Sequence, residues 1–161
     1  MALRLSDTRP STWTGYKVAG APKVLIVEAR FYPDIADELA RGAIAALESA
    51  GATCERIAVP GAFEIPAAIR FAIESGAYDG FVALGCVIRG ETTHYDYVCG
   101  ESARGLNDLA LTHCAAIGYG ILTCENRDQA MARASVGERN KGRDVAGACL
   151  AMIALKEKFG L

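Results

Sequence analysis

The loop and helix start between Gly90 and Asp96 carry the residue types best suited to hold an anion and to move a proton. Gly90 lets the backbone approach a ligand closely, and the Thr93-x-x-Asp96 spacing resembles a capping box. Unpaired N–H groups in the first turn of a helix bind anions, with phosphate the obvious candidate. The glycine patterns of a P-loop and of a dinucleotide site are absent. The spacing predicts an anion site, with an ordinary helix start as the alternative.

His94 is expected in the first turn of that helix. Its imidazole can exchange protons near neutral pH, although a lone histidine is more often structural than catalytic. The neighbouring anion loop favours the proton-transfer interpretation. The other histidine, His113, has no such setting, and we assign it no role.

Two phenylalanines fall just past the ends of strand-like apolar runs: Phe31 after residues 23–29 and Phe63 after residues 53–59. Each ring could stack on a flat heterocycle, a contact worth roughly 0.5–1.5 kcal/mol beyond burial. Alternatively, both rings close the top of the core. Glu64 adds an acceptor for hydroxyl or ring N–H groups, or it is a helix-start charge favoured by the macrodipole.

Arg133 and Lys141 lie in a glycine-containing connection that ends at Gly142. Exposed, solvated charges are the ordinary explanation. An arginine is nevertheless the natural partner of an anion, because its planar fork donates two parallel hydrogen bonds. Both interpretations stay open at the level of spacing.

Composition indicates a single globular domain. The 161 residues are 52% hydrophobic and carry a net charge of −2, without the basic excess of nucleic-acid-binding proteins. Apolar runs such as 81–87 are shorter than the roughly 20 residues of a membrane helix, and no secretion-signal pattern opens the sequence. We expect a cytoplasmic protein with no nucleic-acid or membrane partner.

The six cysteines stand singly, with no CxxC pair, and most fall within apolar segments. We interpret them as reduced, small core residues. Because the chain has only two histidines and no ligand cluster, we predict no metal site.

From residue 23 onward, strand-like and helix-like periodicities alternate. This alternation predicts parallel strands with right-handed crossovers, hence a flavodoxin-like three-layer α/β/α sandwich with a four-stranded parallel sheet. Residues 1–22 lack periodicity and are expected to form an arm outside the domain 23–161. The last helix carries Val145, Cys149, Met152 and Phe159 on one face. The predicted strands are 23–29, 53–59, 80–87 and 117–123, and the predicted helices are 34–50, one from about Pro66, 94–115, one around Gln129 and one ending near Phe159.

Four segments, in their order and spacing, resemble the lumazine synthase family. They are ARF at 29–31, VPGAFEIP at 59–66, LGCVIRGETTHYDYV at 84–98 and NKG at 140–142. The second and third segments are long and specific, so a chance match is improbable. The similarity extends from about Val24 to the C-terminus.

The resemblance implies condensation of 5-amino-6-(D-ribitylamino)uracil with 3,4-dihydroxy-2-butanone 4-phosphate in riboflavin biosynthesis. The products are 6,7-dimethyl-8-ribityllumazine, phosphate and water, and no cofactor is involved. It further implies that His94 shuttles protons and that the aromatic ring of Tyr119 reaches the site from a neighbouring subunit. The implied substrate-binding residues are Phe31, Ala62, Phe63, Glu64, Cys86, Val87, Ile88, Gly90, Glu91, Thr92, Tyr119, Arg133 and Lys141.

The sequence departs from the family pattern in three places. Tyr119 stands where phenylalanine is common, and Tyr32 stands where asparagine is frequent. Residues 135–139 depart from the glycine-lysine pattern associated with large closed shells. We therefore expect a homopentamer with active sites shared between subunits.

Two rival functions remain. A non-catalytic protein of the same fold could bind a flavin or lumazine in the stacking pocket, although such a binder needs no phosphate site. A flavodoxin-like electron carrier is less compatible, because Glu28-Ala29-Arg30-Phe31 replaces the Ser/Thr-rich phosphate loop expected after its first strand.

Overall fold

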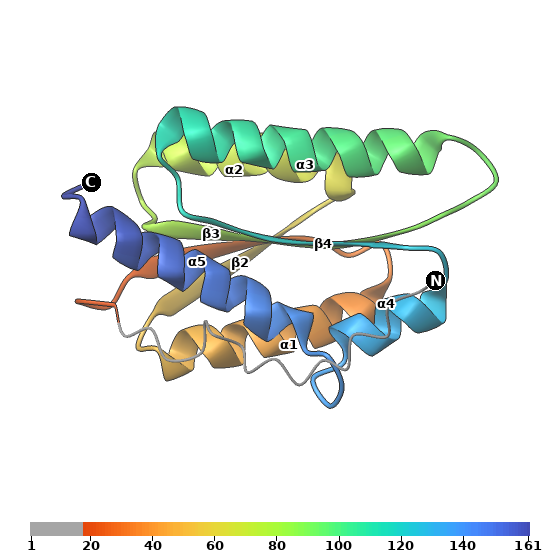
Figure 1. The fold of residues 1–161 in the computed structure, drawn as a ribbon, viewed down its shortest axis with the longest axis horizontal. Coiled ribbons are helices and arrows are strands. Elements are labelled where there is room, and N and C mark those ends of the chain that lie inside the picture. Colours follow the sequence, from red (N-terminus) through yellow and green to blue (C-terminus); the bar gives the residue numbers. More distant parts are fainter. Residues whose placement is uncertain (1–17) are drawn as a thin grey trace, which may run out of the picture.

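In the computed structural model, which describes residues 18–161, a four-stranded parallel sheet separates two layers of helices (Figure 1). The strand order is β2-β1-β3-β4. β1 and β3 form the buried centre, whereas β2 is exposed along most of its length. The strands are β1 (Lys23–Ala29), β2 (Thr53–Val59), β3 (Gly80–Ile88) and β4 (Ile117–Cys124).

Helices α1, α4 and α5 cover one face of the sheet, and α2 and α3 cover the other (Figure 1). The three-layer α/β/α fold with an all-parallel sheet is therefore confirmed. The helices are α1 (Pro33–Ser49), α2 (Ile65–Ser75), α3 (His94–His113), α4 (Arg127–Ala134) and α5 (Lys141–Lys158), with a short 3-10 turn η1 (Ala62–Glu64) before α2.

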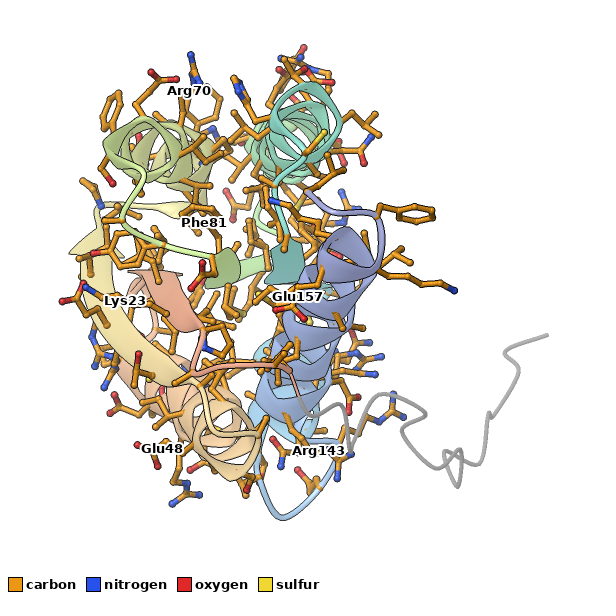
Figure 2. The ribbon with its side chains drawn as sticks, turned by 90° about the vertical axis from the view of Figure 1, so that its left-hand side faces the viewer. Lys23, Glu48, Arg70, Phe81, Arg143 and Glu157 are labelled. Atoms are coloured by element: carbon orange, nitrogen blue, oxygen red, sulfur yellow. The ribbon has the colours of Figure 1, made fainter. Side chains whose placement is uncertain are left out.

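Alternate residues of the central strands feed two separate hydrophobic clusters. Val24 and Ile26 of β1 face α1 and α5, whereas Leu25 and Val27 face α2 and α3. Figure 2 shows Phe81 of β3 beneath the α2 and α3 layer, within the second of these clusters. Burial on both faces explains why the sequence of these strands is almost continuously apolar.

α5 packs closely against the middle of α1. A Cβ atom at Gly142 would lie 2.0 Å from the backbone oxygen of Leu39, so only glycine allows this approach. The predicted apolar face of α5 is partly wrong: Val145 and Cys149 are buried, but Met152 and Phe159 are exposed. The buried side of α5 continues instead through Leu150 and Ile153, which belong to the same hydrophobic cluster as Val24 and Ile26.

The cysteines are all free, and their environments differ from one another. Cys86, Cys124 and Cys149 are buried, as expected for small core residues. Cys114 contradicts that expectation, because it is exposed at the end of α3 with a φ of 50°. Its backbone conformation is left-handed, which ends the helix where a glycine is more usual.

The predicted arm lies mostly outside the described residues. Near its end, Val18 is buried in the cluster formed with α1 and α5. Between residues 18 and 161, the helices are all too short or too polar to cross a membrane.

Candidate functional site

The carboxyl ends of β1 and β3 define the crevice of this fold. Within the sheet, β2 lies on one side of β1 and β3 lies on the other side of β1. In open parallel sheets, ligands bind where the strand order reverses in this way. The residues that follow β1, β2 and β3 therefore lie together at the carboxyl end of the sheet, which is at the right of Figure 1. We call this end of the sheet the carboxyl edge.

Both predicted stacking rings are exposed at this edge. Phe31, in the turn between β1 and α1, is 72% exposed, and Phe63, in η1, is 57% exposed. Neither ring packs in the core of the chain, so the alternative that they close the top of the core is wrong. Ala62 is buried beside Phe63, and Glu64 is exposed.

The last residues of β3 lie at the carboxyl end of the sheet. Cys86 is buried, and Val87 and Ile88 are half-buried. Burial raises the pKa of the Cys86 thiol to about 12, so the thiol is protonated at neutral pH. It can line a pocket as a small apolar group but is no nucleophile there.

The loop after β3, with Gly90, Glu91 and Thr92 exposed, projects beyond the strand ends (Figure 1). Its first residue, Arg89, fixes it at several points. The backbone N–H of Arg89 donates to the carbonyl oxygen of Cys124 at 3.0 Å. The side chain donates to Glu125 at 2.9 Å and to Asp96 at 3.3 Å, and the guanidinium lies 4.2 Å from the ring centroid of Tyr95.

The predicted capping box at the start of α3 is wrong. Thr93 occupies the N-cap position, but its side chain makes no capping hydrogen bond. Its backbone is already helical, with φ −72° and ψ 0°, whereas a capping side chain needs an extended N-cap backbone. The carboxylate of Asp96 turns instead to Arg89.

His94 is the first residue of α3 and is exposed, directly after the loop. Its backbone N–H donates to the Thr92 hydroxyl oxygen at 3.4 Å. His113 ends the same helix and contacts Arg70 through Nδ1 at 3.3 Å. Among residues 18–161, no group of three or more His, Cys, Asp or Glu side chains gathers as a metal site would require.

Arg133 and Lys141 lie on the face of the sheet covered by α1. Arg133, in the last turn of α4, is half-buried and donates to the backbone oxygen of Gln129 at 3.0 Å. Lys141 opens α5, and its Nζ lies 3.4 Å from Asp144 Oδ2. Because Gly142 packs on Leu39, the first turn of α5 sits about 9 Å along α1 from the edge where α1 begins.

Within the chain, Tyr119 lies far from the carboxyl end of the sheet. It is 45% exposed on β4 and pairs with Ala83, whereas Cys124 pairs with Ile88 at the strand ends. Five residues of strand separate the two positions, which corresponds to about 16 Å. A single copy of the chain therefore gathers the residues after β1, β2 and β3 but leaves Tyr119 out of the group.

Two residues that the sequence reasoning did not single out support this edge. One is Arg89, described above. The other is Glu28, a carboxylate only 4% exposed near the end of β1, which accepts from Arg56 at 2.9 Å and from Arg30 at 3.3 Å. An acidic residue inside the apolar run KVLIVEA was the available signal, because a buried charge requires a partner.

The fold defines an α/β protein whose strand order begins that of the flavodoxin-like class, with exposed aromatic rings at the carboxyl end of the sheet. The family model for 6,7-dimethyl-8-ribityllumazine synthase matches residues 21–157. The chain belongs to this family, and the resemblance seen in the sequence is confirmed.

Curated relatives match over nearly their whole length. A 6,7-dimethyl-8-ribityllumazine synthase of Methylobacterium radiotolerans is 54% identical over 94% of this chain and 91% of the relative. The protein of that name from Azorhizobium caulinodans is 52% identical over 96% and 98%. The one from Bartonella bacilliformis is 57% identical over 86% and 93%.

Proposed function

We infer that the chain condenses 5-amino-6-(D-ribitylamino)uracil with 3,4-dihydroxy-2-butanone 4-phosphate to give 6,7-dimethyl-8-ribityllumazine, phosphate and water. The match to the family across residues 21–157 carries this conclusion. The exposed rings and the loop at the switch point support it, because they offer a flat-ring surface beside an anion site. The reaction belongs to riboflavin biosynthesis, and the free cysteines suit a cytoplasmic enzyme.

The chemistry asks for orientation, anion binding and proton transfer. An amine condenses with a ketone and water is lost, phosphate leaves, and the ring closes with loss of a second water. In our assignment Phe31 and Phe63 hold the pyrimidine, the loop from Gly90 binds the phosphate with Arg133, and His94 carries protons. Holding both substrates in a reactive geometry supplies a large share of the acceleration, and a positioned acid or base adds on the order of 10²–10⁴-fold.

Mixing the purified protein with both substrates tests the proposal directly. Lumazine absorbance should rise together with free phosphate, each dependent on the presence of both substrates. Binding of a lumazine or flavin without turnover would instead identify the non-catalytic binder. A catalytic domain of residues 23–161, preceded by an arm of residues 1–22 whose Val18 packs against that domain, remains part of this proposal.

Arg89→Gln should raise the KM for the butanone phosphate by about 3- to 10-fold and leave the KM for the pyrimidine within about twofold. The reason is that Arg89 ties the loop to Glu125 and Asp96, and a network of charges holds geometry better than one exposed pair. Steady-state kinetics with each substrate varied in turn measures the split.

Glu125→Gln separates positioning from direct contact with phosphate. If Arg89 acts by holding the loop, removing its partner also raises the KM for the butanone phosphate. If Arg89 binds phosphate itself, freeing it from Glu125 leaves that KM unchanged or lowers it. The second outcome contradicts the positioning role.

We further propose a homopentamer of about 85 kDa, five times the 17.0 kDa chain, with each site shared by two subunits. Tyr119 and Lys141 are set back from the carboxyl edge of their own subunit. A neighbour in a head-to-tail ring can bring them to the site and close off water. The exposed edge strand β2 offers a surface for such a neighbour or for its arm.

Mixing two impaired variants tests the shared site. When Phe63→Ala and Lys141→Ala subunits are unfolded together and reassembled in equal amounts, about one site in four should be fully intact because neighbours pair at random, and activity should rise above that of either variant alone. Each variant reassembled alone serves as the control. If Phe63 and Lys141 serve the same site from one subunit, mixing restores nothing. Light scattering reports the mass, and an active monomer contradicts the proposal.

A further inference from the structure

The ring of Phe31 is exposed, yet it is not isolated. It meets the ring of Tyr32 edge to face, with centroids 5.0 Å apart and planes inclined by 69°. This is the geometry that aromatic quadrupoles favour. An exposed phenylalanine otherwise exchanges among several rotamers, and binding a flat ligand must freeze one of them. A neighbour that already selects the orientation lowers that cost.

Tyr32 is itself held from behind. Its ring packs partly buried against the core cluster beneath α1, and its carbonyl oxygen accepts from the N–H of Ala36 at 2.9 Å. The guanidinium of Arg127 lies 5.9 Å from the Tyr32 ring centroid, at the outer limit of a cation–π contact. These contacts come from the core, from α1 and from α4, so the Tyr32 ring has a fixed place.

An ion pair between the first turns of α1 and α4 completes this support. Arg127 donates a hydrogen bond to Asp34, which lowers the pKa of the Asp34 carboxyl. The pair therefore stays charged at neutral pH. It anchors the guanidinium that faces Tyr32, so the support of the Phe31 ring extends to a second helix.

We propose that Tyr32 is a positioning residue for the pyrimidine substrate, acting by holding the exposed ring of Phe31 in its stacking orientation. The proposal rests on the proposed function, because it deepens the role of the same site. Tyr32 need not touch the substrate. Its effect should appear in pyrimidine binding and should vanish when Phe31 no longer offers an aromatic ring.

Kinetics of the assembled full-length protein test this. Tyr32→Asn should raise the KM for the pyrimidine by about 2- to 12-fold, which corresponds to roughly 0.5–1.5 kcal/mol, and leave the KM for the butanone phosphate within about twofold. Tyr32→Phe keeps the ring and should restore wild-type values. Tyr32 is the N-cap of α1 and makes no capping bond. Asparagine is a good N-cap, so the variant gains a cap that offsets lost packing and supports folding.

The decisive comparison uses a Phe31→Leu background. There, Tyr32→Asn should change the KM for the pyrimidine by less than about twofold, because no ring remains to be positioned. An equal rise in both backgrounds overturns the proposal, as does a KM change shared by both substrates. Failure of the proposed function would look different, since the wild-type protein itself would then form no lumazine.

Discussion

Replacing His94 with alanine is expected to lower kcat by roughly one to three orders of magnitude, about the range for losing one acid–base group. The KM values should change much less, because the imidazole is assigned to proton transfer and the loop and the rings to binding. The exposed position of His94 on the first turn of α3 leaves it free to reach a ligand at the crevice. Steady-state kinetics between pH 6 and 8 measures the effect.

The chain supplies its own control for this experiment. His113 lies at the other end of the same helix and contacts Arg70. His113→Ala removes an identical side chain from α3 without touching the crevice, so kcat should stay at the wild-type value. If His94→Ala retains full kcat throughout the neutral range, His94 has no place in the mechanism.

Arg133→Ala should raise the KM for the butanone phosphate by about 10- to 100-fold, since a hydrogen bond to a charged group contributes roughly 1.5–3 kcal/mol. The KM for the pyrimidine should stay within about threefold. The guanidinium of Arg133 donates to a backbone oxygen of its own helix, a bond it can exchange for the stronger one to phosphate. Kinetics with one substrate saturating separates the two constants.

Two further variants sharpen the Arg133 test. Arg133→Lys keeps the charge but loses the planar fork, so its KM should fall between those of wild type and Arg133→Ala. Arg104→Ala removes an exposed arginine whose partners, Glu101 and Asp108, lie on its own helix. This variant controls for net charge. Equal effects of Arg133→Ala on both substrates would show that the residue does not act through the phosphate.

The elements were predictable because their signals are local. Continuous apolar runs marked the buried strands, and helical spacing with a glycine or proline at the boundary marked most helices, to within a few residues of the observed ends. All four strands begin where predicted, and Phe31 and Phe63 do lie just past strand ends. Parallel pairing alone predicted that both residues lie at the carboxyl end of the sheet.

The ion pairs near the carboxyl end of the sheet were not predictable, because they depend on the register between neighbouring strands. Arg89 reaches Glu125 across 36 positions of sequence, and Arg56 reaches Glu28 across 28. No periodicity reports which residues of two strands stand opposite each other. The capping box failed for a related reason: the Thr93-x-x-Asp96 spacing permits the motif, but Arg89 competes for the Asp96 carboxylate. Met152 is exposed although it was predicted to be buried, because helical spacing does not report which side of α5 packs against the core.

The exposed edge strand β2 affects how readily newly made chains aggregate. Within residues 18–161, β2 pairs only with β1, so the N–H and C=O groups along its outer side lack a strand partner. Such an edge accepts any extended polypeptide, which is how aggregation starts. Charged Glu55 and Arg56 in the strand slow indiscriminate pairing. The yield of native protein during rapid synthesis should therefore depend on how well these charges keep the outer side of β2 from pairing with other chains.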